Sequence, residues 1–287
     1  MPGAGAVGAG ELNPAAAVAE LTGLTPTGVH PLADHVFEVD TEDGDLVVAK
    51  YDPRQGAVDA EVAGLLWLAE PGAVAIPDVR AHDDRWLVME QIEPSAPSTV
   101  AAEELGRRLA DLHAAGAPTF GASTGPEQAW IGLAPMRCVP SPEWAHWYVA
   151  DRIEPYLRNA ADRQLIDRDG VSTIETLCGR IDVPHEPPAR LHGDLWSGNV
   201  VWARQAWLID PAAHGGHRET DLAMLALFGC PHLDRVIAAY DEHRPLADGW
   251  QARTPLHQLF PLLVHTVLFG SGYARQAVAA AQAALRA

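Results

Sequence analysis

Three oxygen-bearing side chains stand at a spacing that could hold a metal ion and activate a hydroxyl group. Asp194 and Asn199 lie five residues apart in the glycine-containing string His192–Asn199 (HGDLWSGN), and Asp210 ends the next predicted hairpin. Paired strands lie about 5 Å apart, so Asn199 and Asp210 can face one ion with Asp194 in front of them. Mg²⁺ prefers a few hard oxygen ligands of this kind, and the remaining carboxylate can accept the proton of an attacking hydroxyl.

The order of these residues is that of the parts used in protein-kinase phosphoryl transfer. There a catalytic-loop Asp and an Asn five residues later precede a metal-binding Asp at the end of the following hairpin. An isolated Asp and Asn in a loop is more simply a surface turn held by side-chain hydrogen bonds. The complete string, with Asp210 at the matching distance, favours a catalytic site over that alternative.

The chain contains a single lysine, Lys50, against 19 arginines. It ends the predicted strand Leu46–Tyr51, eleven residues before Glu61 on a predicted helix. A strand lysine that is held by a helix glutamate and reaches the α- and β-phosphates is the other half of a kinase site. We therefore expect Lys50 and Glu61 to pair, although a solvated helix face would also explain Glu61.

The elements that must position these side chains fall into two groups. Hydrophobic periodicity before residue 92 predicts helices at 14–22 and 57–68 and two hairpins, with strands at 36–39, 46–51, 79–81 and 86–91. Later segments are mostly helical, at 103–115, 143–165, 172–181, 219–228, 233–243 and 254–285, with a loop at 116–142 and a strand pair at 200–202 and 206–209. The pattern predicts an α+β, two-lobed, protein-kinase-like fold.

The expected lobes follow from this order of elements. Residues 1–13 form a flexible start, and 14–92 form an N-terminal lobe that binds ATP with a small antiparallel sheet and one helix packed on it. The proline-containing segment 93–99 is interpreted as a hinge. Residues 100–287 form a larger, mostly helical C-terminal lobe that carries the catalytic loop and the acceptor site.

The first hairpin lacks the glycine-rich turn that covers the phosphates in protein kinases. The stretch Val29–Val36 has no glycine after Gly28. His30, Asp34 or His35 could supply polar contacts instead, or could be ordinary surface residues.

The composition excludes several classes of partner. The formal net charge is −18, whereas nucleic acids and anionic membranes require clustered Lys and Arg. No apolar run approaches the ~18 residues that span a bilayer, and the first ten residues lack the layout of a signal peptide. The three cysteines have no close spacing, which argues against a disulfide framework or a zinc site. We expect a cytoplasmic monomer that binds neither nucleic acid nor membrane.

Two blocks of sequence resemble the fructosamine (ketosamine) 3-kinase family. One is His192–Asn199; the other is Asp210–Ala212 followed by Gly216–Met224 and Leu227–Gly229. The similarity extends over about residues 25–275. Aminoglycoside and choline kinases share the His-Gly-Asp and Asn pattern but lack Trp196 and the Gly-His-Arg-Glu block.

This resemblance implies ATP- and Mg²⁺-dependent phosphorylation of the 3-hydroxyl of a ketosamine, a ribulosamine- or fructosamine-type glycation adduct. The 3-phosphate then destabilises the adduct and frees the amine. Carried over residue by residue, the resemblance implies a general base at Asp194, metal ligands at Asn199 and Asp210, a phosphate-binding pair at Lys50 and Glu61, and an adenine-binding hinge at Glu90, Gln91 and Ile92.

Four further residues of the two blocks have roles that the resemblance only suggests. Trp196 could stack on the sugar or its amine-bearing end, or pack in the core. His217 and Arg218 could shape the acceptor pocket or pair with nearby carboxylates. Asp221 would brace the catalytic loop. The family often has two aromatic residues where His214 and Gly215 stand here, a difference that could change the acceptor. A kinase of an aminoglycoside or amino alcohol is therefore one alternative, and the missing glycines of the first hairpin leave a non-catalytic nucleotide-binding protein as another.

Overall fold

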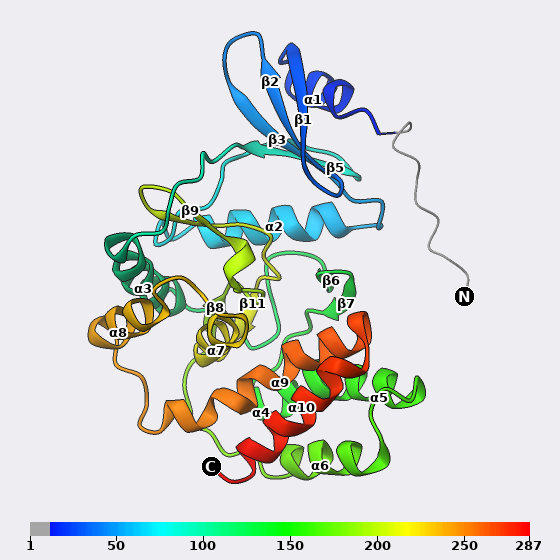
Figure 1. Ribbon diagram of the computed structural model, residues 1–287, viewed down its shortest axis with the longest axis vertical. Coiled ribbons are helices and arrows are strands. Elements are labelled where there is room, and N and C mark those ends of the chain that lie inside the picture. The colour runs from blue at the N-terminus through cyan, green and yellow to red at the C-terminus, as the bar shows by residue number, and fades with distance from the viewer. Residues whose placement is uncertain (1–11) are drawn as a thin grey trace.

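The computed structural model describes residues 12–287, and a five-stranded antiparallel sheet precedes a larger helical part (Figure 1). The flexible start expected at 1–13 lies almost wholly outside the described residues. The strand order is β1-β2-β3-β5-β4. The elements of this first part are α1 (Pro14–Thr22), β1 (Pro26–Ala33), β2 (Val36–Thr41), β3 (Leu46–Tyr51), α2 (Ala57–Ala69), β4 (Val79–His82) and β5 (Trp86–Glu90).

The two faces of the sheet pack against different helices. Val47 of β3 belongs to a small core that contains Val18 of α1. Val48, the next residue, belongs to a main core that contains Val62 of α2. Because side chains alternate along a strand, Lys50 projects from the same face as Val48, toward α2.

The second part of the described chain is built of helices, with three short antiparallel strand pairs between them. Its elements are α3 (Thr99–Ala114), β6 (Gln128–Ile131), β7 (Ala134–Arg137), α4 (Trp144–Trp147), a π-helical turn (Tyr148–Ile153), α5 (Glu154–Asp162), α6 (Arg168–Cys178), β8 (Ala189–Leu191), a 3₁₀ turn (Ser197–Asn199), β9 (Val200–Trp202), β10 (Ala206–Leu208), β11 (His214–Gly216), α7 (Glu219–Phe228), α8 (Leu233–His243), α9 (Trp250–Phe269) and α10 (Ser271–Ala284). The strand pairs are β6 with β7, β8 with β11, and β9 with β10. Helix α3 packs on α8, and α9 packs on α10 (Figure 1). The main core runs from the sheet through α2 into α3 and α8, which joins the two parts.

The predicted α+β class is confirmed, and the structure differs from the predicted elements in a few places. Strand β1 was not predicted, and the segment expected to be a loop at 116–142 contains the β6–β7 hairpin. The helix expected at 143–165 is interrupted by the π-helical turn, directly before Pro155, which has no N–H to donate to the preceding turn. The helix expected at 254–285 divides at Gly270, whose φ is 96°. Among residues 12–287 no helix has the length and apolar character needed to cross a membrane.

Candidate active site

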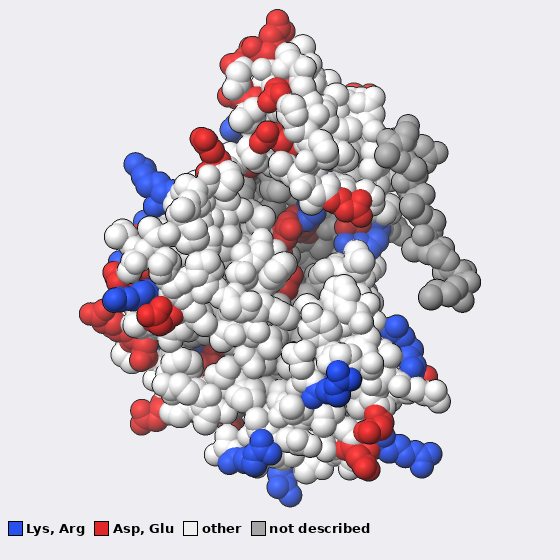
Figure 2. Space-filling view, in the orientation of Figure 1, with Lys and Arg blue, Asp and Glu red and all other residues white. Residues whose placement is uncertain are grey.

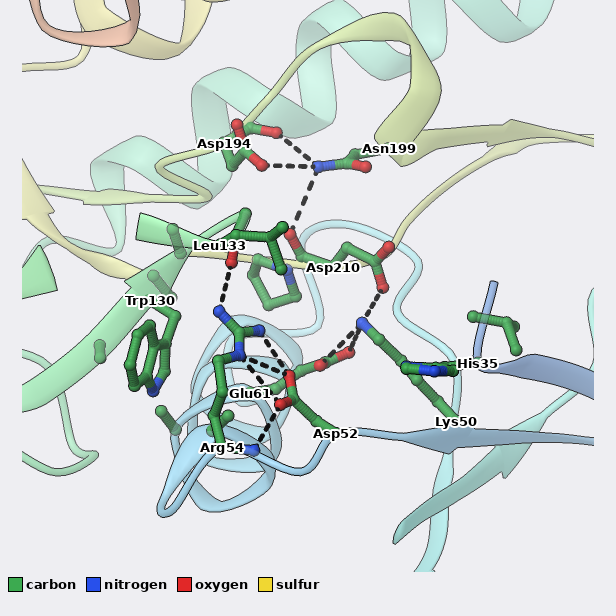
Figure 3. A pocket seen from close by; sticks show the side chains of 18 of the residues that line it. His35, Lys50, Asp52, Arg54, Glu61, Trp130, Leu133, Asp194, Asn199 and Asp210 are labelled. Carbon is green, nitrogen blue, oxygen red and sulfur yellow. Dashed lines mark hydrogen bonds and ion pairs between the residues drawn. The ribbon is translucent and has the colours of Figure 1, made fainter. Parts of the chain in front are cut away.

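A cavity of about 710 Å³ opens between the sheet and the helical part. Its wall comes from the β1–β2 turn, the end of β3 with the following loop, α2, the β6–β7 hairpin, and the segment 194–213. Figure 2 shows the hollow with acidic and basic side chains at its floor. Lys50, Glu61, Asp194, Asn199 and Asp210 all line this cavity, so the structure brings together the five residues on which the catalytic prediction depends (Figure 3).

Lys50 lies between two carboxylates of the site, those of Glu61 and Asp210. Its ammonium lies 2.8 Å from both carboxylate oxygens of Glu61 and 2.8 Å from Oδ1 of Asp210. Only 20% of the Lys50 side chain is exposed, so the cation is not in bulk solvent. Burial alone would lower the pKa of Lys50, but the two carboxylates outweigh it and raise that pKa, which keeps the ammonium charged. The expected Lys50–Glu61 pair is present, and Asp210 joins it from the helical part.

Asn199 ties Asp194 to Asp210. Its Nδ2 donates to the backbone oxygen of Asp194 at 2.8 Å, to Oδ2 of Asp194 at 3.2 Å and to the backbone oxygen of Asp210 at 3.3 Å. The amide oxygen of Asn199 takes no part in these bonds. In Asp210, the Oδ1 atom accepts from Lys50, and the Oδ2 atom does not. One amide oxygen and one carboxylate oxygen therefore remain beside the cavity, and this donor set fits Mg²⁺.

Asp194 has the electrostatic properties of a general base. Burial raises the pKa of its carboxyl group to about 7, an effect opposed by the hydrogen bond from Asn199 and increased by the negative charges of Asp210 and Asp221. A base whose pKa lies near the working pH combines a substantial ionised fraction with strong proton affinity. Such a shift in a cavity is also typical of a functional carboxylate.

A buried network fixes the loop that carries Asp194. The carboxylate of Asp221 accepts the backbone N–H groups of His192 at 2.8 Å and Gly193 at 3.0 Å, and it lies 3.2 Å from Nε2 of His113. Nε2 of His192 donates to the backbone oxygen of Ile209 at 2.9 Å, which links the loop to the hairpin strand before Asp210. Asp221, fully buried, thus braces the catalytic loop, as the resemblance suggested.

Gly193 is required in this loop by both its backbone and its surroundings. Its φ is +81°, a conformation that L side chains rarely adopt. A Cβ atom at this position would lie 2.1 Å from the backbone oxygen of Ala212. The close approach of these two segments is what brings Asp194 beside the hairpin that ends at Asp210.

Trp196 lies at the mouth of the cavity. The residue is 40% exposed and lines the cavity, so it does not belong to the core. Its ring packs edge-on against Phe228, with 6.2 Å between ring centroids, and folds over Gly198, where a Cβ would come within 2.3 Å of the indole. The indole is therefore held in place with one part open to a ligand.

His217 and Arg218 do not line the cavity. Arg218 forms a bidentate pair with Glu186, with N–O distances of 2.8 and 2.7 Å, which was the alternative interpretation of this residue. His217 is 2% exposed and packs near Glu219 and His257, a buried group whose ligand atoms lie within 4.8 Å of one another. Burial lowers the pKa of His217 to about 3, so its ring is neutral, and its Nδ1 accepts the backbone N–H of Glu219 at 3.3 Å. In the part of the chain that the structure describes, its Nε2 is buried without a hydrogen-bond partner. The group lies at the start of α7, away from the residues that line the cavity.

The predicted adenine-binding segment lies at the end of β5: Glu90 is its last residue, and Gln91 and Ile92 follow it. None of the three is among the residues that line this cavity. Glu90 pairs with Val47 of β3, and the side chain of Gln91 donates to Oε2 of Glu38 at 2.7 Å. These contacts fix the strand end beside the sheet. The adenine-binding role stays a prediction.

Sequence reasoning missed a group of residues on the opposite side of the cavity. The carboxylate of Asp52 holds the guanidinium of Arg54, which lies 4.5 Å above the ring of Trp130 and donates to the backbone oxygen of Gly132 at 2.8 Å (Figure 3). Arg54 thereby connects the sheet part to the β6–β7 hairpin of the helical part. Trp130 and Gly132 fall within the range 25–275 that resembles the family, but they lie in the segment 116–142 that was predicted to be a loop.

Comparisons with known proteins identify the family and the fold of the chain. The family model described as fructosamine kinase matches residues 34–287. A crystal structure from Thermobifida fusca, of a protein proposed to be a fructosamine-3-kinase, is 47% identical and has a TM-score of 0.90 over 95% of this chain and 98% of that one. The ketosamine-3-kinase of Mus musculus is 30% identical over 273 residues, 82% of this chain and 86% of the mouse protein. The macrolide 2′-phosphotransferase MphH of Brachybacterium faecium, 17% identical with a TM-score of 0.58 over 94% and 95% of the two chains, shares the fold.

Proposed function

Because the chain belongs to the fructosamine kinase family, we propose that it transfers the γ-phosphate of ATP to the 3-hydroxyl of a ketosamine. The substrate class is a ribulosamine- or fructosamine-type glycation adduct. The observation that carries the proposal is the convergence of Lys50, Asp194, Asn199 and Asp210 on one cavity whose mouth holds the family's tryptophan, Trp196.

Asp194 is the proposed general base. In the transfer, its carboxylate accepts the proton of the 3-hydroxyl while that oxygen attacks the γ-phosphorus and the bond to the leaving ADP breaks. Burial of the group and its pKa of about 7 support this role. Asn199, which donates to Oδ2 of Asp194, orients the carboxylate.

Lys50 is the proposed phosphate-binding cation, held in position by Glu61. The amide oxygen of Asn199 and the carboxylate of Asp210 would hold Mg²⁺, which supplies charge neutralisation on the transferred phosphate. The backbone of Glu90, Gln91 and Ile92 would bind adenine. In catalysis Lys50 exchanges its contact with Asp210 for a contact with the nucleotide phosphates.

Trp196 is the proposed contact for the acceptor. Its partly open indole at the cavity mouth can stack on the sugar or attract the amine, and a cation over an indole gains ~0.5–2 kcal/mol. His217 and Arg218 lie away from the cavity, so the proposal gives them no contact with the substrate.

An acceptor panel tests the proposal. ADP release is measured with a ribulosamine, a fructosamine, an aminoglycoside and choline, each with Mg²⁺ and ATP, and with Asp194→Asn as the control. We expect turnover of the two ketosamines that Asp194→Asn reduces by at least about a hundredfold, or about 2.7 kcal/mol of barrier. Preference for the aminoglycoside or choline would replace the substrate class. Stabilisation by Mg²⁺ and ATP without turnover of any acceptor would identify a nucleotide-binding protein instead.

A further inference from the structure

The turn between β1 and β2 is built without glycine and ends in a histidine. Ala33 pairs with Val36, so Asp34 and His35 alone make the turn. His35 has a φ of 61°, in the left-handed region that few non-glycine residues adopt. Gly28, the one glycine of this hairpin, pairs with Asp40 toward its other end.

This turn lies directly beside the lysine strand. Val36, the residue after the turn, pairs with Lys50, and the backbone oxygen of His35 accepts the N–H of Tyr51 at 2.9 Å. The ring of His35 packs edge-on against Tyr51, with 5.6 Å between centroids. Two contacts from strand β3 thus fix both the backbone and the ring of His35.

The imidazole of His35 faces the cavity with an N–H to spare. His35 lines the same cavity as Lys50 and Asp210, and all three side chains are labelled in Figure 3. Within residues 12–287 its ring nitrogens make no hydrogen bond; Asp34, whose carboxylate is 98% exposed, lies 3.8 Å from Nε2. The side chain of His35 is itself only 34% exposed.

The cavity has few groups that can bind an anion. Its lining carboxylates outnumber its cations by five to two: Asp34, Asp52, Glu61, Asp194 and Asp210 against Lys50 and Arg54. Arg54 is already engaged by Asp52 and by the oxygen of Gly132. A nucleotide polyphosphate therefore needs donors beyond Lys50, and His35 is a fixed donor on the sheet side of the cavity.

We propose that His35 is a nucleotide-positioning residue whose imidazole N–H donates to the β- or γ-phosphate of ATP. In protein kinases, a glycine-rich turn covers the nucleotide phosphates with backbone groups. Here the side chain of His35 would make a contact with the phosphates in place of that turn. The proposal rests on the proposed function, because it requires ATP in this cavity.

Nucleotide binding by single variants tests this role. Dissociation constants for ATP, ADP and AMP, each with Mg²⁺, are measured by titration calorimetry on the full chain. His35→Gly removes the ring and leaves the turn unstrained, because glycine adopts positive φ freely. His35→Asn keeps a side-chain N–H and also tolerates this backbone. The matched control is His30→Ala, since His30 lies in the same hairpin and pairs with Asp40 at 2.9 Å.

We expect His35→Gly to weaken ATP binding about tenfold and AMP binding less than twofold, because AMP lacks both phosphates that His35 could contact. ADP binding should also weaken about tenfold if the contact is to the β-phosphate, and should stay unchanged if it is to the γ-phosphate. His35→Asn should recover part of the loss, and His30→Ala should bind all three nucleotides like the wild type. Unchanged ATP affinity in His35→Gly would overturn the proposal, as would an equal loss for AMP, which would indicate a structural role. If the wild type binds no ATP, the proposed function itself fails. If the wild type binds ATP and His35→Gly binds it equally well, only the role of His35 fails, so the two failures are distinguishable.

Discussion

Replacing Asp194 by Asn should make the protein more stable while it abolishes activity. Burial raises the pKa of the Asp194 carboxyl group from 3.8 to about 7. The folded state therefore binds more protons at this group than the unfolded state does between those two values, and stability falls as the pH rises through that window. Asn has no charge to bury and can still accept the hydrogen bond from Asn199.

The size of the effect follows from the same two pKa values. One pKa unit corresponds to about 1.4 kcal/mol, so three units predict an advantage for Asp194→Asn that approaches about 4 kcal/mol above pH 7. The advantage should shrink by roughly 1.4 kcal/mol per pH unit between pH 7 and 4. The buried carboxylate that catalysis requires at Asp194 would then lower the free energy of unfolding, a trade-off that is common in active sites.

Urea unfolding of the ligand-free wild type and Asp194→Asn at pH 5, 6, 7 and 8 measures this difference. Asp111→Asn is the control: burial raises the pKa of Asp111, but the hydrogen bonds and charges of His243 and Arg244 together outweigh it and lower that pKa. That variant should not gain stability as the pH rises. A difference between wild type and Asp194→Asn that is constant over this range would refute the electrostatic account of Asp194.

Two further predictions concern the neighbours of Asp194. Lys50→Met should remove activity and cost about 3 kcal/mol of stability in urea unfolding, because it leaves Glu61 without its cation; adding Glu61→Leu should return much of the stability and none of the activity. An unaltered midpoint for Lys50→Met would contradict the pairing. Gly193→Ala should cost at least about 2 kcal/mol, since its Cβ would meet the backbone oxygen of Ala212. Gly23→Ala is the matched control, with φ 76° and open space around it, and should cost only about 1 kcal/mol; equal losses would show that strain alone decides.

The parts of the site that the sequence predicted are those with local spacing. Lys50 and Glu61 belong to consecutive elements, so the periodicity of a strand and a helix was enough to bring them together. Asn199 and Asp210 flank one hairpin, and its pairing, Leu208 with Val200, brings their backbones close. The contact of Lys50 with Asp210 spans 160 residues and was accessible only through the order of parts in a known fold.

Other features depend on long-range packing that no local pattern encodes. The β6–β7 hairpin has strands of four residues inside a segment rich in Gly and Pro, too short for a clear alternation. Strand β1 contains Gly28 and Pro31, which weaken a strand signal, yet it forms because it pairs with β2. His217 is buried against His257, forty residues away on α9. Its position outside the cavity therefore could not be predicted from the residues next to it in the sequence.

The most direct test of the central claim is phosphorus NMR of a reaction that contains the protein, Mg²⁺, ATP and a ribulosamine. The account predicts a new phosphomonoester whose phosphorus couples to the proton on C3 of the sugar, formed by the wild type and at least about a hundredfold more slowly by Asp194→Asn. ATP hydrolysis without a phosphomonoester, or a product formed equally fast by Asp194→Asn, would contradict it.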